Sequence, residues 1–153
     1  MSVSVYLQLV HPRMLAAVRR EVAPDAVRSA WRPALDKVWE LIRSRPDLRT
    51  DGHNIFLYHH PLEQGAAMLC DFGVEVTRAF EAVGEVYATA TPEGEAAVAT
   101  HRGPYHRMNE THEAIRQWMA VNQRRSAGCS WEIYGDPTPD PADTQTTGVY
   151  LLT

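Results

Sequence analysis

One carboxylate lies within a segment that otherwise has the residue types of a half-buried strand, residues 129–137 with the sequence CSWEIYGDP. Because side chains alternate along a strand, Glu132 and Tyr134 share one face, whereas Trp131 and Ile133 share the other, which we expect to face a helix. A solvated face is the ordinary position of a strand glutamate. A buried Glu132 would instead need a cationic ligand, a water molecule to activate or a hydrogen bond, because an unpaired buried carboxylate is costly.

Histidine and cysteine side chains are the other candidates for chemistry. His53, His59 and His60 cluster around one predicted strand, but adjacent histidines on a strand point to opposite faces, which is poor geometry for metal ligands. Cys70 and Cys129 lie far apart without C-x-x-C spacing, which is typical of free thiols in a reducing compartment. We therefore predict no metal site and no cofactor, and a cytoplasmic location.

The composition is that of one ordinary domain, which we place at residues 1–153. No apolar run approaches the ~20 residues that span a bilayer, and the N-terminus lacks the features of a secretory signal. The formal net charge is -4, and basic residues occur as scattered pairs such as Arg19-Arg20 and Arg124-Arg125. The sequence thus disfavours membranes and direct nucleic-acid binding, which depends on phosphate neutralisation, and is compatible with cationic or neutral small molecules.

Hydrophobic periodicity predicts two successive units, each with two strands, a helix and two more strands. In the first unit, strands at residues 3–10 and 14–22 form a candidate hairpin, and a helix at residues 27–44 either holds Pro33 in its first turn or is kinked there. The other expected strands are residues 54–60, 69–77, 86–91, 95–102, 130–135 and 147–153. The second helix has a predicted buried stripe that consists of Tyr105, Met108, His112, Ile115 and Met119.

Short identities between the two units occur in the same order along the chain. The segment FLYHHP at residues 56–61 aligns with EIYGDP at residues 132–137, and Val5-Tyr6 aligns with Val86-Tyr87. We interpret the pattern as a tandem duplication of a β-β-α-β-β unit with halves at about residues 1–80 and 81–153; chance similarity is the alternative. The predicted fold class is α+β with pseudo-twofold symmetry and a central ligand cleft at the seam between the halves.

The duplication predicts which side chains surround Glu132. It aligns Glu132 with Phe56 and Tyr134 with Tyr58, so one carboxylate would lie among aromatic rings if the two faces meet across the seam. Trp39 is assigned to the same pocket, as are Phe56 and Tyr58, from strand phase and the repeat. An aromatic wall that holds a single anion is the predicted site.

Two segments resemble a known family. The H-x-G-P-Y motif at residues 101–105 and the E-I-Y-x-x-P motif at residues 132–137 are similar to the GyrI-like small-molecule-binding domain, also called the bacterial transcription activator effector-binding domain. The family includes ligand domains of multidrug and Rob-type regulators and stand-alone gyrase-inhibitory proteins. The resemblance covers essentially the whole chain and implies two β-rich units, each with one long helix, around a central cleft.

The resemblance also implies roles for individual residues. In ligand-binding members the corresponding glutamate lies at the bottom of the cleft and receives cationic, lipophilic compounds, a role that falls to Glu132. Tyr105 would aim its ring into the cleft. Apart from the resemblance, the position of His101 before Gly103-Pro104 would let it reach the mouth of the cleft as a polar contact, with a purely structural role as the alternative. The expected function is binding of a hydrophobic or cationic aromatic small molecule, with Glu132 as the polar anchor.

Two other functions stay open at this point. Some stand-alone members hydrolyse cyclopropane-bearing toxins, and in such an enzyme Glu132 would activate water while Tyr134 or Tyr105 bonds the substrate carbonyl. Alternatively, the protein could inhibit gyrase or another protein partner. Because the first predicted strand begins close to Met1, we expect no helix-turn-helix and hence a stand-alone domain, present as a monomer or a homodimer.

Overall fold

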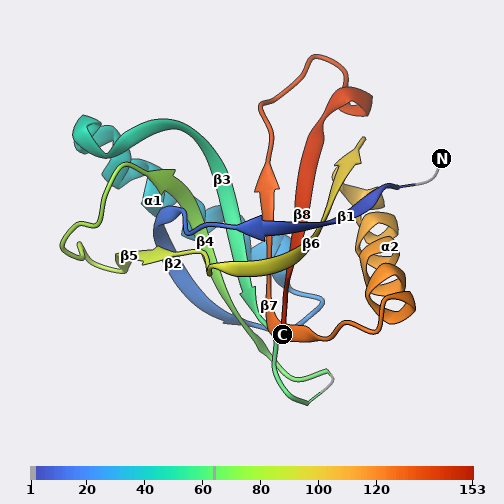
Figure 1. The fold of residues 1–153 in the computed structure, drawn as a ribbon. Helices are drawn as coiled ribbons and strands as arrows, with labels where there is room; N and C mark the ends of the chain where they lie inside the picture. The colour runs from blue at the N-terminus through green and yellow to red at the C-terminus, as the bar shows by residue number, and fades with distance from the viewer. Residues whose placement is uncertain (1–2, 64) are drawn as a thin grey trace.

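The computed structural model describes residues 3–63 and 65–153, with the backbone only for Asp51. The main elements, in chain order, are β1 (Val5–Val10), β2 (Met14–Val22), α1 (Val27–Ser44), β3 (Arg49–His59), β4 (Met68–Val76), β5 (Val86–Ala90), β6 (Gly94–Arg102), α2 (Met108–Val121), β7 (Ser126–Tyr134) and β8 (Gln145–Leu152) (Figure 1). Three short 3-10 helices are η1 (Pro46–Leu48), η2 (Tyr105–Arg107) and η3 (Pro141–Asp143). The predicted order of strands and helices is confirmed, although β3 begins at Arg49 instead of residue 54.

The strands form one antiparallel, 8-stranded sheet with the order β1-β6-β8-β7-β3-β4-β2-β5. Read inward from one edge the order is β1, β6, β8, β7, and from the other edge it is β5, β2, β4, β3. Each strand of one half therefore has its counterpart in the other half at the same distance from the central β7–β3 pair. Phe56 of β3 is directly opposite Glu132 of β7. The predicted α+β class is therefore confirmed, whereas an internal duplication stays an interpretation that this symmetry supports.

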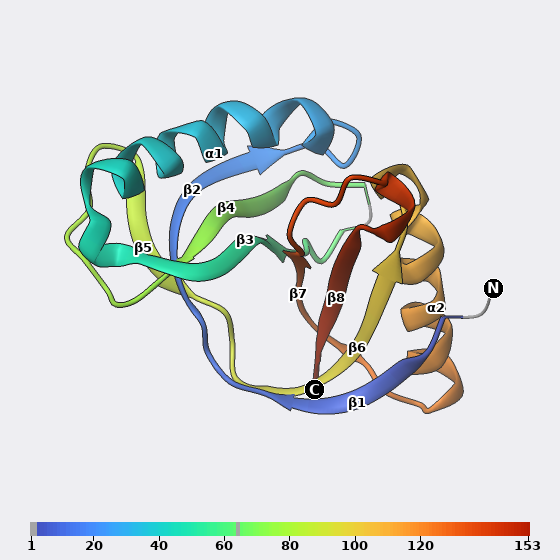
Figure 2. The same ribbon diagram turned by 90° about the horizontal axis from the view of Figure 1, so that it is seen from above.

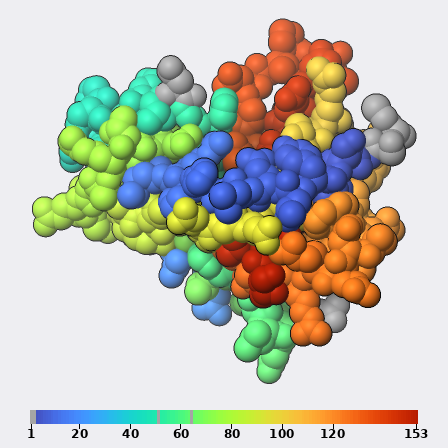
Figure 3. Space-filling model, viewed as in Figure 1, coloured from blue at the N-terminus to red at the C-terminus, as the bar shows by residue number. Residues whose placement is uncertain are grey.

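The predicted hairpin of the first two strands is wrong, because β1 pairs with β6 and β2 pairs with β5. Each half thus supplies an edge strand to the other half (Figure 2). The links 11–13 and 91–93 contain His11-Pro12 and Thr91-Pro92, and a residue before proline is restricted to extended conformations, so the chain runs on instead of turning back. Figure 3 shows β1, in blue, at the surface beside β6, in yellow.

The two links also contact each other. Arg13 N donates to Thr91 Oγ1 at 2.8 Å, and Thr91 N donates to the carbonyl oxygen of Arg13 at 3.0 Å. These two hydrogen bonds join the segments that carry the chain from one half to the other. These hydrogen bonds therefore hold the two links together where they pass between the halves.

Both helices pack on one face of the sheet. α1 buries Ala34, Leu35, Val38 and Ile42 against β2 and β4, and it contains Pro33 beyond its first turn. α2 lies against β6 and β8 and buries Met108, Thr111, Ile115 and Met119. Because the helices cover opposite ends of the sheet (Figure 2), the central strands β7 and β3 lie between them. None of the described helices is both long and apolar enough to cross a membrane.

The other face of the sheet has its own core without a helix. That cluster contains Leu15, Ile55, Leu57, Ala96, Val98, Cys129, Trp131 and Val149, which come from β2, β3, β6, β7 and β8. Trp131 is 3% exposed there, and Ile133 packs against the same cluster. The expectation that this apolar pair faces a helix is therefore wrong, because strands of the same sheet cover it. The face of Glu132 is the one that lies between the helices.

Candidate functional site

A cavity of about 730 Å³ lies on the helix face of the sheet at the β3–β7 junction. Its lining includes side chains from both halves of the chain: Trp31 of α1, Phe56 and Tyr58 of β3, Tyr105 of η2, and Glu132 and Tyr134 of β7. A second cavity of about 530 Å³ shares Tyr58, Tyr105 and Glu132 with the first. Glu132 therefore lies where the two cavities meet.

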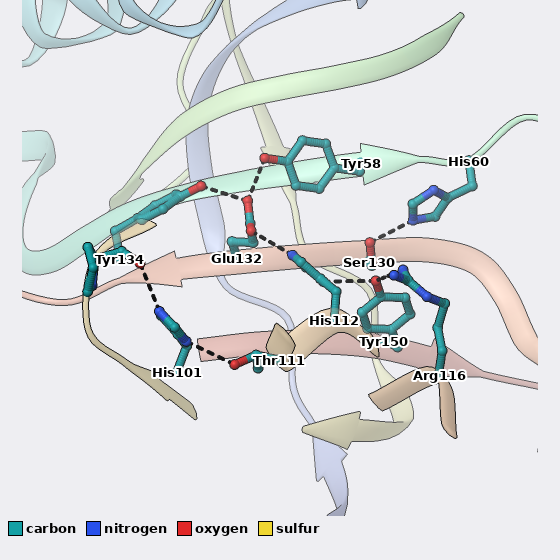
Figure 4. Close-up of polar contacts among 11 residues, drawn as sticks. Tyr58, His60, His101, Thr111, His112, Arg116, Ser130, Glu132, Tyr134 and Tyr150 are labelled. Atoms are coloured by element: carbon teal, nitrogen blue, oxygen red, sulfur yellow. Dashed lines mark hydrogen bonds and ion pairs between the residues drawn. The ribbon is translucent and has the colours of Figure 1, made fainter. Parts of the chain in front are cut away.

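The carboxylate of Glu132 is buried and accepts hydrogen bonds on both oxygens. Glu132 is 7% exposed, which excludes a solvated position. The hydroxyl groups of Tyr58 and Tyr134 each donate to Oε1 at 2.6 Å, and Nε2 of His112 lies 2.9 Å from Oε2 (Figure 4). The donors come from β3, β7 and α2, so three elements hold one carboxylate at the floor of the cleft.

These contacts keep Glu132 ionised. Burial has the largest single effect on the pKa of Glu132 and raises it, but the hydrogen bonds from His112, Tyr134 and Tyr58 together outweigh burial and hold the pKa below its usual range. Burial and the neighbouring negative charge raise the pKa values of Tyr58 and Tyr134 well above the ordinary phenol value. Both phenols therefore keep their protons and act as donors to a charged carboxylate.

A chain of hydrogen bonds orients the imidazole of His112. Arg116 Nη1 donates to the hydroxyl oxygen of Tyr150 at 3.3 Å, and that oxygen lies 2.9 Å from Nδ1 of His112. Because a guanidinium can only donate, the Tyr150 hydroxyl is free to donate to Nδ1, which leaves the Nε2 proton of His112 for Glu132. Burial raises the pKa of Tyr150, so this hydroxyl keeps its proton. The sequence reasoning missed both His112 and Tyr150 as site residues.

Aromatic side chains form the wall beside the carboxylate. The ring of Phe56 contacts those of Tyr134 and Phe72 edge-on, with centroids 4.7 Å and 5.0 Å apart, and lies 6.0 Å from the ring of Trp31. The Tyr105 ring lies 5.2 Å from that of Tyr134 and is 53% exposed, which places it at the mouth. Edge-on packing fixes ring orientation, so the wall is preformed.

The structure places two of the predicted site residues away from this wall. Trp39 and His101 are not among the described residues that line either cavity. The N-terminal end of α1 borders the cleft, so Trp31 reaches it, whereas Trp39 lies about 12 Å further along the helix. His101 is 6% exposed, with Nδ1 3.0 Å from Thr111 Oγ1 and Nε2 3.0 Å from the carbonyl oxygen of Pro104. These contacts match the purely structural role of His101, not a polar contact at the mouth of the cleft.

The second cavity contains a further polar pair. Nε2 of His60 lies 2.6 Å from Ser130 Oγ, and the His60 ring stacks on that of Tyr150 with centroids 6.3 Å apart. Burial is the largest cause that lowers the pKa of His60. His60 is therefore a neutral hydrogen-bonding group near neutral pH, and it links the end of β3 to β7.

The remaining histidines of the predicted cluster have separate partners. Nδ1 of His53 lies 3.3 Å from Asp136 Oδ1, and Nε2 of His59 lies 3.0 Å from Asp71 Oδ2. Within the part of the chain that the structure describes, no group of three or more His, Cys, Asp or Glu side chains is arranged to hold a metal ion.

An aromatic cleft with one ionised carboxylate on its floor is typical of a domain that binds small molecules. The family model of the GyrI-like small molecule binding domain matches residues 5–151, so the chain belongs to this family. A search of curated proteins finds no match to the chain.

Solved structures share the fold at low sequence identity. The EcmrR C-terminal domain superposes with a TM-score of 0.82 and 19% identity, covering 100% of this chain and 99% of that one. The chain spans 57% of the EcmrR chain in a complex with DNA. SAV2435 bound to tetraphenylphosphonium has a TM-score of 0.74 and 10% identity, with 98% and 94% of the two chains covered. A hydrolase encoded by lin2189 from Listeria innocua has a TM-score of 0.61 and 15% identity, with 97% and 91% covered.

Proposed function

We propose that the protein binds hydrophobic or cationic aromatic small molecules in the cleft between its halves, with Glu132 as the polar anchor. The observation that carries this proposal is a buried carboxylate that stays ionised at the floor of an aromatic cavity. A cation that enters gains attraction to the carboxylate and to the faces of the aromatic rings at low local dielectric.

The bonding of Glu132 indicates which cations fit best. Two phenols and one imidazole already donate to its oxygens, so the protein's own groups satisfy the buried charge. A ligand therefore needs no N–H or O–H group to replace a missing hydrogen bond. Bulky organic cations with a delocalised or shielded charge, attracted through space, suit this arrangement. The structure of SAV2435 with tetraphenylphosphonium supports the proposal by showing that a protein of this fold accommodates such a cation.

Calorimetric titration with tetraphenylphosphonium tests the proposal. We expect binding to the wild type and a loss of about tenfold or more in affinity for Glu132→Gln, because the charge is removed while the shape is kept. Glu93→Gln is the matched control, since the Glu93 side chain is 64% exposed and lies outside both cavities. Equal affinities for the wild type and Glu132→Gln would exclude the anchoring role.

Hydrolysis is a second candidate function, favoured by the pairing of Glu132 with His112 beside two phenols. For a cyclopropane conjugated to a carbonyl, Glu132 would take a proton from water as the oxygen attacks a ring carbon and the ring C–C bond breaks. The electron pair would pass to the carbonyl oxygen, which Tyr105 would hydrogen-bond, because the Tyr134 hydroxyl already donates to Glu132. The lowered pKa of Glu132 makes it a weak base, which favours binding as the main function.

Mass spectrometry separates the two candidates. A cyclopropanoid that gains the mass of one water molecule with the wild type, but not with Glu132→Gln, would establish hydrolysis. A stoichiometric complex without product would establish binding alone.

A further inference from the structure

Asn54 brings a second polar group to the aromatic cavity. It belongs to β3 and lies two residues before Phe56, so both side chains are on the helix face of the sheet. Asn54 lines the first cavity together with Phe56 and Glu132. Because Phe56 is directly opposite Glu132, Asn54 lies about 7 Å from that pair along the strand direction.

The indole of Trp39 fixes which way the amide of Asn54 faces. Trp39 Nε1 donates a hydrogen bond to Asn54 Oδ1 at 3.2 Å. An indole N–H can only donate, so the amide atom that faces Trp39 must be the oxygen. Trp39 does not line the cavity, whereas Asn54 does. The amide oxygen is therefore turned toward α1, and Nδ2 is the polar atom left for the cavity.

The amide nitrogen has no hydrogen-bond partner among the described residues, although Nδ2 carries two protons. Nearby, Glu132 offers only acceptor atoms, and its three donors are already turned toward it. The other donor side chains that line this cavity lie outside the sheet and include Arg28, Tyr105, His106, Thr138 and Thr144. On the strand floor, a ligand oxygen would thus find a donor at Asn54 that is not already bonded to Glu132. Glu132 and Asn54 are complementary on this floor, since Glu132 attracts positive charge and Asn54 donates a hydrogen bond.

We propose that Asn54 is a specificity residue that selects organic cations which also carry a hydrogen-bond acceptor, such as a carbonyl or ether oxygen, on the side that faces Asn54 when the charge lies near Glu132. Trp39 is the positioning residue: it lies outside the cavity lining and holds the amide in this orientation through its hydrogen bond to Oδ1. The inference rests on the proposed function, because the cation must enter the cleft for Asn54 to meet the acceptor. It adds a requirement on the ligand that the carboxylate alone does not impose.

A matched set of phosphonium ions tests this proposal. Tetraphenylphosphonium has no acceptor, whereas the 3-acetylphenyl and 4-acetylphenyl derivatives of triphenylphosphonium add one carbonyl at the same charge. The quantity measured is the ratio of affinities for an acetyl derivative and tetraphenylphosphonium. We expect Asn54→Leu, which is close in size, to lower this ratio by about fivefold for at least one isomer, the size of one neutral hydrogen bond.

Variants at Trp39 test the positioning role. Trp39→Phe keeps a large apolar ring but cannot fix the amide, so the ratio should fall part of the way toward that of Asn54→Leu. General damage to the cleft would lower affinity for all three cations and leave the ratio unchanged. An unchanged ratio in Asn54→Leu for both isomers, with tetraphenylphosphonium still bound by the wild type, would overturn the inference alone. Failure of the wild type to bind any of the three would overturn the proposed function as well.

Discussion

His112 of α2 and Glu132 of β7 face each other with 2.9 Å between Nε2 and Oε2, which joins the second helix to the centre of the sheet. The pair is held from both sides, since Tyr150 bonds Nδ1 of the imidazole and two phenols bond the other carboxylate oxygen. The charge in the cleft therefore depends on groups that a ligand need not touch.

Replacing His112 by phenylalanine should shift the pH dependence of cation binding. The His112 hydrogen bond lowers the pKa of Glu132, so its loss raises that pKa. As pH falls, the affinity of His112→Phe for tetraphenylphosphonium should decline at a higher pH than that of the wild type. His106→Phe is the control, because His106 lines the second cavity together with His112 but has no hydrogen bond to Glu132 among the described residues. Coincident midpoints for His112→Phe and the wild type would contradict the assignment.

Removing either phenol that bonds Glu132 should destabilise the fold. Tyr58→Phe and Tyr134→Phe each delete one hydrogen bond to a buried charge, and we expect each to lower the free energy of unfolding by about 1–3 kcal/mol. Urea denaturation measures this difference. Tyr6→Phe provides the comparison, since Tyr6 is 47% exposed and loses no buried hydrogen bond. A loss for Tyr6→Phe as large as for the two site variants would show that the bonds to Glu132 are not the cause.

The stabilising contribution of Glu132 should disappear in acid. Its pKa in the folded protein is lowered relative to the ordinary value near 4.5, so the contribution is fully present above that value and is lost as pH falls through the folded pKa. The difference in unfolding free energy between the wild type and Glu132→Gln should be constant above about pH 6 and shrink below about pH 4. Denaturation curves at several pH values measure it. If this difference in unfolding free energy grew as pH fell, the lowered pKa assigned to Glu132 would be wrong.

The two cysteines should be unreactive in the folded protein. Burial and nearby carboxylates raise the pKa of Cys70 to about 12 and that of Cys129 to about 11, and both side chains are buried. Because the thiolate is the nucleophile, a disulfide reagent at about pH 8 should label the two cysteines only after the protein unfolds. Colour release in native buffer and in guanidinium chloride compares the two states. Rapid labelling of two thiols in native buffer would contradict this expectation.

Local pattern was enough to predict much of the fold and part of the site. Alternation along residues 129–137 placed Glu132 and Tyr134 on one face, and the comparison of the halves added Phe56 and Tyr58. These positions depend on strand periodicity, which sequence records directly. The structure brings all four to the first cavity.

Features that depend on how distant elements dock could not be predicted in the same way. The exchange of β1 and β5 depends on the direction of two short links, and only their X-Pro steps hinted at it. The repeat does not say which end of α1 borders the cleft, so it could not show that Trp31, and not Trp39, lines the cavity. A histidine within the apolar stripe of α2 was the one available signal for His112, because a titratable group on a buried face needs a partner.

The exchange of edge strands limits how the cleft can adapt to its occupants. If the halves swung apart like the leaves of a hinge, β1 would have to leave β6, or β5 leave β2, and the bonds between Arg13 and Thr91 would break. The β3–β7 floor is thus a fixed frame. Under the proposed function, compounds of different shape would be admitted by side-chain rotation and by the segment around Pro137, Thr138 and Pro141, which lines the cavity outside the sheet. Substitutions in that segment would then change which compounds fit while leaving the strand pairing of the floor intact.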